Sequence, residues 1–145
     1  MKKLLLVMVL AIVAGTGEFR QWTWPAPAAA AELLHGDALL GDAFKKQAGN
    51  VQVQSSGVVV QVLPDVNDGD RQQRFMLGLA TGQTIMIVHN VSLAPRIPLL
   101  NMGDVVEFNG LYEWNAQGGA VRWTHRDPAG WHPPGWLRHN GRTFQ

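Results

Sequence analysis

The sequence predicts a mainly β protein: a small five- to six-stranded OB-like Greek-key barrel with an N-terminal helix and an ordered C-terminal coil. Three observations support this fold class. A segment with helical spacing is followed by short stretches of alternating or β-branched residues. Glycine, proline and asparagine separate these stretches, as is typical of tight turns. A short connector follows the third of five principal strands, which matches the strand order of an OB-fold.

Length, charge and cysteine content limit the possible functions. The chain has 145 residues, enough for one domain. It has no cysteine, which excludes disulfides, thiolate zinc sites, a cysteine nucleophile and a lipid-modified cysteine anchor. From Glu32 onward there are nine Lys and Arg residues and ten Asp and Glu residues, a net charge of −1. The domain is therefore no bulk binder of polyanions, although the segment 120–145 holds four arginines and one acid, Asp127.

Residues 1–31 are expected to be a signal peptide with an Ala/Pro-rich cleavage region. Two lysines precede an apolar core, Leu4 to Ala14, of 11 residues, whereas a membrane-spanning helix needs roughly 20. We favour cleavage near Ala31; the alternative is an uncleaved anchor whose tryptophans lie at the membrane interface. Both interpretations place the domain outside the cytoplasm, in the bacterial periplasm or secreted. After cleavage we expect no stable membrane span.

The single domain is expected at 32–145 and begins with a helix at 32–48. Apolar residues there recur three and four positions apart, as on one face of a helix. Gly36 and Gly41 weaken the pattern, each by up to about 1 kcal/mol relative to alanine. Gly49 and Asn50 then provide a stop signal.

The barrel is expected at 51–125. Its strands are predicted in "VQVQ", "GVVVQVLPD", "RFMLGLATG", "QTIMIVHNV", "DVVEFNGLYEWN" and "AVRWTH". Thr81 and Gly82 join two of them in a hairpin. If "VQVQ" forms a strand of its own, the barrel has six strands, and an SH3-like barrel is the other alternative. From Arg126 to Gln145 neither the helical spacing nor the alternation of a strand is present, so this tail is expected to be coil.

Four stretches carry a resemblance to a known family: "VLPD", "RQQRFMLGLATGQTIMIVHNVSLAPRIP", "GDVVEFNGLYEWNAQGG" and "VRWTHRDPAGWHPPGWLRHNGRTFQ". They resemble domain-of-unknown-function family 3465, a group of small exported bacterial proteins. The resemblance covers Gly57 to Gln145. It implies a secreted or periplasmic single domain, and it implies no reaction. The family often has two histidines after the threonine, where this chain has His125 and then Arg126.

The tail histidines raise the hypothesis of a metal site. His125, His132 and His139 are spaced by seven residues each, and neutral imidazole binds Zn²⁺, Cu²⁺ or Ni²⁺. The candidate ligands are His125, His132 and Asp127, with Glu113 and His89 as further donors. Such a site would support a metal-dependent hydrolase. We favour the alternative, in which these imidazoles bond backbone groups of a proline-rich coil and the protein has no cofactor.

His125, Arg126 and Asp127 also suggest nuclease chemistry, as a general base, a phosphate clamp and an orienting group. One such triplet is a weak signal. A turn at Asp127 and Pro128, held by an ion pair with a nearby arginine, is the more typical structure for this pattern.

OB barrels bind oligonucleotides and oligosaccharides across the face of their second and third strands. The tail offers tryptophans for stacking beside arginines, which suits single-stranded nucleic acid or a glycan. We therefore expect an exported, non-catalytic binding module whose ligand is an oligonucleotide, a glycan or an envelope protein. The alternative is a metal-dependent hydrolase or nuclease that uses the C-terminal histidines. The candidate binding residues are His89, Arg96, Glu113, Trp114, His125, Asp127, His132 and His139.

Overall fold

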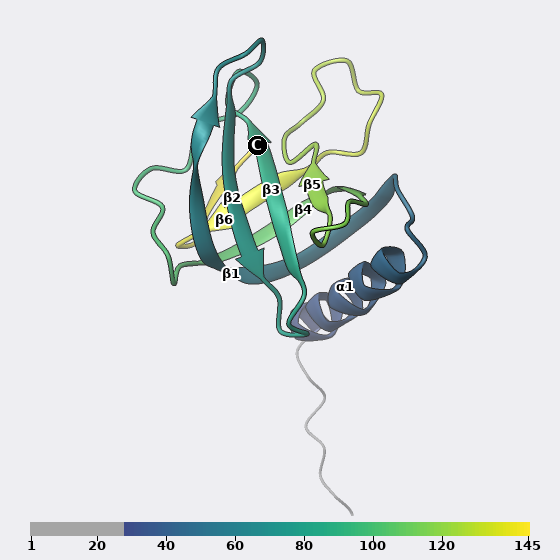
Figure 1. Ribbon diagram of the computed structural model, residues 1–145. Helices are drawn as coiled ribbons and strands as arrows, with labels where there is room; N and C mark the ends of the chain where they lie inside the picture. The colour runs from purple at the N-terminus through teal and green to yellow at the C-terminus, as the bar shows by residue number, and fades with distance from the viewer. Residues whose placement is uncertain (1–27) are drawn as a thin grey trace, which may run out of the picture.

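The described structure consists of one helix and seven strands that belong to a single sheet (Figure 1). It is a computed structural model that describes residues 28–145; of the signal peptide and cleavage region predicted at 1–31, residues 1–27 lie outside it. The helix α1 spans Ala28–Lys45. The strands are β1 (Val51–Val66), β2 (Gln72–Gly78), β3 (Thr84–Asn90), β4 (Val105–Glu113), β5 (Ala120–Arg122), β6 (Trp136–His139) and β7 (Arg142–Phe144).

Five of these strands close into a barrel. Their order around the ring is β1-β2-β3-β5-β4, and β4 pairs back with β1. The pairs are antiparallel except for β3 with β5, which run parallel. This is the five-stranded Greek-key ring of an OB-fold. The predicted fold class, a mainly β OB-like barrel with an N-terminal helix, is confirmed.

The long strand β1 closes the ring because it serves two neighbours. Its first half pairs with β4, from Val51 opposite Tyr112 to Val58 opposite Val105, and its second half pairs with β2. The stretches "VQVQ" and "GVVVQVLPD" are therefore one strand, and the ring has five strands rather than six. Gly57 lies where the partner changes, and a Cβ there would come within 2.9 Å of the Cβ of Leu77.

The core follows the alternation of the strands. On β2 and β4 the inward positions are buried while the residues between them are partly exposed. Phe75, Phe108 and Tyr112 are fully buried at such positions. At one end of the barrel α1 adds Leu40 and Ala43 to this core, so the helix acts as the cover of that end.

The bounds of α1 differ from the predicted 32–48, because the helix starts four residues earlier and ends three residues earlier. Contacts with β1 hold the helix α1 in place. The carboxylate of Asp37 accepts a hydrogen bond from the Ser55 hydroxyl, and Gly36 packs against the backbone of Gln54. Within residues 28–145, no helix is both long enough and apolar enough to cross a membrane.

The connector between β3 and β4 covers the opposite end of the barrel. Ile97 is buried there. The side-chain amide of Gln73 makes two hydrogen bonds of 3.0 Å with the backbone of Ile97. Gln73 Nε2 donates to the Ile97 carbonyl, and the Ile97 N–H donates to Gln73 Oε1. A buried amide on β2 thus holds this connector in place without a helix.

The tail differs from the predicted coil. β5 ends at Arg122, three residues earlier than "AVRWTH" suggested. After a loop at 123–135 the chain returns to the same edge of β4 as β6, and β7 pairs with β6 in a hairpin. Asn140 and Gly141 join them with φ angles of 50° and 73°, as in a type I′ turn. Strands of four and three residues are too short for alternation to reveal them.

The two helix glycines generate a first prediction. Gly41→Ala should raise the free energy of unfolding by about 0.5–1 kcal/mol, because alanine is the better helix former and a Cβ there meets nothing within 4 Å. Gly36→Ala is the matched control and should lower it, because its Cβ would overlap the carbonyl oxygen of Gln54. Urea unfolding measures both. Equal effects of the two substitutions would contradict the packing of α1 on β1.

Candidate ligand-binding cleft

A left-handed residue at the end of β5 sets the path of the tail. Trp123 has a φ of 55°, which is unusual for a bulky side chain and costs on the order of 1–3 kcal/mol. The loop closes over this residue, since a Cβ on Gly135 would overlap the Trp123 carbonyl oxygen. The Gly135 N–H also donates to the carbonyl of His125 at 3.0 Å. Trp123 therefore lies where the two ends of the loop 123–135 meet, and its backbone sets the direction in which the loop leaves the sheet.

Thr124 is fully buried and bonded to His89. Nε2 of His89 lies 2.9 Å from the carbonyl oxygen of Pro95, which can only accept, so Nε2 carries the proton. Nδ1 then accepts from the Thr124 hydroxyl at 2.8 Å. Burial lowers the pKa of His89 to about 4, although its hydrogen bonds to Pro95 and Thr124 oppose the shift. His89, predicted as a binding residue, is a neutral structural bridge.

His125, the next residue, is buried but unbonded. It is only 5% exposed, and neither ring nitrogen has a hydrogen-bond partner among the described residues. Burial lowers its pKa, while the negative charges of Asp127 and Asp70 act in the opposite direction. A neutral imidazole carries one donor and one acceptor. Leaving both unpaired in the interior costs on the order of 1–3 kcal/mol for each group.

Two imidazoles lie against the indole of Trp123. His132 stacks on it with ring centres 3.9 Å apart and planes at 20°, and His125 lies 5.3 Å away with planes at 30°. The indole thus brings two of the predicted site residues, His125 and His132, beside one ring.

His125 and Trp123 line a small cleft on the outer surface of the barrel, with a volume of about 220 Å³. It lies at the barrel end that carries the β1–β2 loop and the end of β3, where the loop 123–135 rises in yellow-green away from α1 (Figure 1). The other lining residues are Asp70, Gln72, Val88, Asn90, Leu93 and Arg122. OB barrels bind ligands across the second and third strands and their loops, and this cleft lies on that side.

The charged groups of the cleft already have partners. Asp70 accepts a hydrogen bond of 3.1 Å from the amide of Asn90. Arg122 pairs with Glu113 at 3.2 Å across β5 and β4. Glu113, another predicted site residue, therefore acts beside the cleft by neutralising the charge of Arg122.

Asp127 organises the loop. Oδ1 accepts from the N–H of Ala129 at 2.9 Å, and Oδ2 accepts from the N–H groups of Trp131 at 2.8 Å and His132 at 3.0 Å. These bonds, that of Ala129 first, hold the pKa of Asp127 below its usual value. The predicted turn at Asp127 and Pro128 is present, but the carboxylate bonds backbone N–H groups where an ion pair with an arginine was expected, and Arg122 pairs with Glu113. Trp131 stands 86% exposed on this loop.

The remaining predicted residues lie elsewhere. Arg96 forms an exposed ion pair with Asp65. His139 is buried in β6 and bonds Asp104 through Nε2 at 2.9 Å. Trp114 is partly buried against the core, and its indole N–H has no partner among the described residues.

The metal hypothesis requires several ligands in one place. The described part of the chain contains no group of three or more His, Cys, Asp or Glu residues that could hold a metal ion. Both oxygens of Asp127 are used by backbone N–H groups, and His132 is stacked on Trp123. The three proposed ligands His125, His132 and Asp127 thus lie near one another without forming a group of this kind.

One known protein family matches the chain over nearly the same residues that the structure describes. A model described as protein of unknown function (DUF3465) matches residues 25–145. The chain belongs to this family. The match includes α1, the barrel and the tail hairpin, so the DUF3465 domain covers everything that the structure describes. No curated protein matches the chain.

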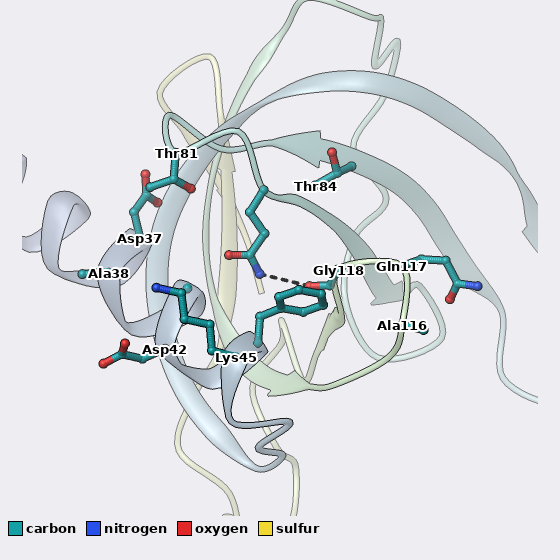
Figure 2. A pocket seen from close by; sticks show the side chains of 12 residues that line it. Asp37, Ala38, Asp42, Lys45, Thr81, Thr84, Ala116, Gln117 and Gly118 are labelled. Atoms are coloured by element: carbon teal, nitrogen blue, oxygen red, sulfur yellow. Dashed lines mark hydrogen bonds between the residues drawn. The ribbon is translucent and has the colours of Figure 1, made fainter.

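A second, larger hollow of the DUF3465 domain lies beside α1, with a volume of about 740 Å³. Figure 2 shows its wall on the helix side, with Asp37, Asp42 and Lys45. The turns β2–β3 and β4–β5 form the other wall, where Gln83 Nε2 donates to the carbonyl of Gly118 at 3.0 Å (Figure 2). It holds none of the predicted site residues.

Sequence reasoning missed several members of the smaller cleft as binding residues. Asp70, Gln72 and Asn90 belong to the β1–β2 loop, to the start of β2 and to the end of β3. These residues could have been inferred from the predicted OB-like strand order, because ligands of this fold contact those segments. Nothing in the local sequence indicates that His125 is buried without a partner.

The low pKa of His89 generates a second prediction. The unfolded chain binds a proton on His89 below pH 6.5 and the folded protein only below about 4. The stability from neutral His89 is therefore complete above pH 6.5 and is lost as the pH falls from 6.5 toward 4. The loss should be on the order of 3 kcal/mol. Burial of His125 adds a loss in the same direction.

Urea unfolding over this pH range measures the effect, with His89→Gln as the comparison. Glutamine keeps a donor and an acceptor but does not titrate, so the variant should show a flatter pH dependence. An unchanged slope would contradict the burial of a neutral imidazole.

The bonds of Asp127 generate a third prediction. Asp127→Ala should accelerate amide hydrogen exchange at Ala129, Trp131 and His132, because those three N–H groups lose their acceptor. The barrel should keep its exchange protection, since the loop lies outside it. Arg126→Ala is the control, because that exposed neighbour makes none of these bonds. Equal exchange in the two variants would show that the carboxylate does not hold the loop.

Proposed function

We propose that the protein is a non-catalytic binding module that takes its ligand in the cleft lined by His125. One observation carries this proposal: a buried imidazole with two unpaired ring nitrogens lies in the wall of an outward-facing cleft. Unpaired polar groups inside a protein are costly. A ligand that bonds them regains this free energy on binding, which makes His125 the centre of the site.

The position of the cleft on the barrel supports the same proposal. It spans the ends of β2, β3 and β5 together with the β1–β2 loop. This is the region through which OB barrels commonly bind their ligands. Hydrogen bonds fix the segments around the cleft, because Gln73 and His89 bond the β3–β4 connector and Asp127 bonds the backbone of the tail loop.

The surroundings of His125 favour binding over catalysis. A histidine base is normally oriented by a second group on its other ring nitrogen, and His125 has no such bond among the described residues. Asp127 bonds backbone N–H groups and Asp70 bonds Asn90. The cleft therefore lacks the paired, oriented groups that acid–base chemistry requires.

We also propose that the module works outside the cytoplasm. The support is the sequence of residues 1–31, with its basic start, short apolar core and Ala/Pro-rich region. Detection of the processed chain in a periplasmic or culture fraction would support export, and retention of the unprocessed chain in the cytosol would contradict it.

The fourth prediction tests the cleft. In a nuclear magnetic resonance screen with small polar fragments, the bound fragments should shift the imidazole signals of His125 and the indole signal of Trp123. His125→Phe should abolish the shift of the Trp123 indole signal, because an aromatic ring remains but its nitrogens are removed. His132→Phe is the matched control, since it alters a ring that stacks on Trp123 but does not line the cleft. Fragments that cluster beside α1, in the hollow of Figure 2, would contradict the proposed site.

A further inference from the structure

We infer that the ligand is an uncharged, polyhydroxylated ring, a sugar unit of a glycan, and that one of its hydroxyl groups bonds the imidazole of His125. This inference rests on the proposed function and adds the chemical class of the ligand. Four properties of the cleft carry it: its charge, its hydrogen-bonding groups, its size and its apolar wall.

The charge of the cleft disfavours phosphate. Its ionisable lining groups are Asp70, Arg122 and His125. Arg122 is paired with Glu113, which leaves the carboxylate of Asp70 without a cation of equal strength in the lining. Nucleic-acid sites need unpaired Lys or Arg side chains to neutralise phosphates. An oligonucleotide, one of the ligands expected from the sequence, therefore fits this cleft less well than a neutral molecule.

The hydrogen-bonding groups match hydroxyls. A neutral imidazole needs an acceptor for its N–H and a donor for its bare nitrogen, and a hydroxyl group serves as either. Gln72 brings an amide to the lining, and Asn90 and Asp70, which bond each other, keep a second amide N–H and further carboxylate lone pairs. Together these groups offer both donors and acceptors. Adjacent hydroxyls of a sugar ring present the same mixture, whereas a phosphate offers acceptors alone.

The size and apolar wall match a single ring. The volume of about 220 Å³ lies below the roughly 300–1,000 Å³ that is usual for drug-sized ligands. Val88, Leu93 and Trp123 add apolar surface to the lining, and Leu93 is 47% exposed. A sugar ring has C–H groups that pack on such a wall while its hydroxyls face the polar side.

The nitrogens of His125 are covered from bulk solvent in this structure, so a ligand reaches them by a small shift of the ring or of its neighbours. Because the imidazole lies against the indole of Trp123, such a shift changes the surroundings of both rings. A bound sugar should therefore change the indole signal of Trp123 together with the imidazole signals of His125, and leave Trp114 and Trp136 unchanged.

The fifth prediction is tested by titration of the purified protein with cello-, chito- and malto-oligosaccharides, followed by nuclear magnetic resonance. At least one series should bind and shift the His125 and Trp123 signals. His125→Phe should weaken that binding by roughly tenfold, as expected for the loss of one or two hydrogen bonds, and His132→Phe should leave it unchanged. Gln72→Leu, on the partly exposed rim, gives a second variant that does not alter a buried group.

Two contrary outcomes are distinguishable. If no sugar binds but a single-stranded oligothymidylate or small polar fragments shift His125, the glycan inference is overturned and the proposed binding site stands. If sugars bind but shift only the exposed Trp131, and His125→Phe has no effect, both the inference and the proposed site are overturned. Absence of any change at His125 with all three sugar series likewise overturns the inference.

Discussion

The hydrogen-bonded chain from Thr124 through His89 to Pro95 determines where the candidate site lies. His89 points into the core from the end of β3, directly across from Gln73 on β2. These two polar side chains bond the connector at Pro95 and Ile97, which covers one end of the barrel. Because Thr124 is bonded to the same imidazole, the first residues of the tail loop are fixed to the core. His125 is the next residue, and its position depends on this bridge.

The path of the tail explains how an unpaired imidazole arises. β5 and β6 lie one after the other along the same edge of β4, and the loop 123–135 leaves that edge between them. A direct continuation would have given residue 125 a place in the sheet and Trp123 an ordinary extended backbone. The chain instead accepts a left-handed tryptophan and two unpaired nitrogens within three residues. Strain and unsatisfied groups that occur together in this way are characteristic of functional sites.

The sequence predicted the barrel better than the site, for a physical reason. Alternation and turn residues act locally, so the change from helical to strand spacing and the hairpin at Thr81 and Gly82 were visible. The hairpin at Asn140 and Gly141 was missed, because the strands beside it are too short for their alternation to be seen. The cleft joins residues as far apart as Asp70 and His125, and the unpaired state of His125 depends on what surrounds it in three dimensions. Of the predicted site residues, His125 is the one that lines this cleft.

The size of a hollow does not decide which end of the barrel binds a ligand. The hollow beside α1 is the larger, but two of its polar side chains have internal roles: Asp37 bonds Ser55 and Gln83 bonds the backbone of Gly118. The helix α1 already closes that end of the barrel and packs Leu40 and Ala43 into its core. The other end holds an imidazole whose bonds are incomplete. Because binding is favourable only where a ligand improves on the free protein, the smaller cleft has the stronger physical reason to bind one.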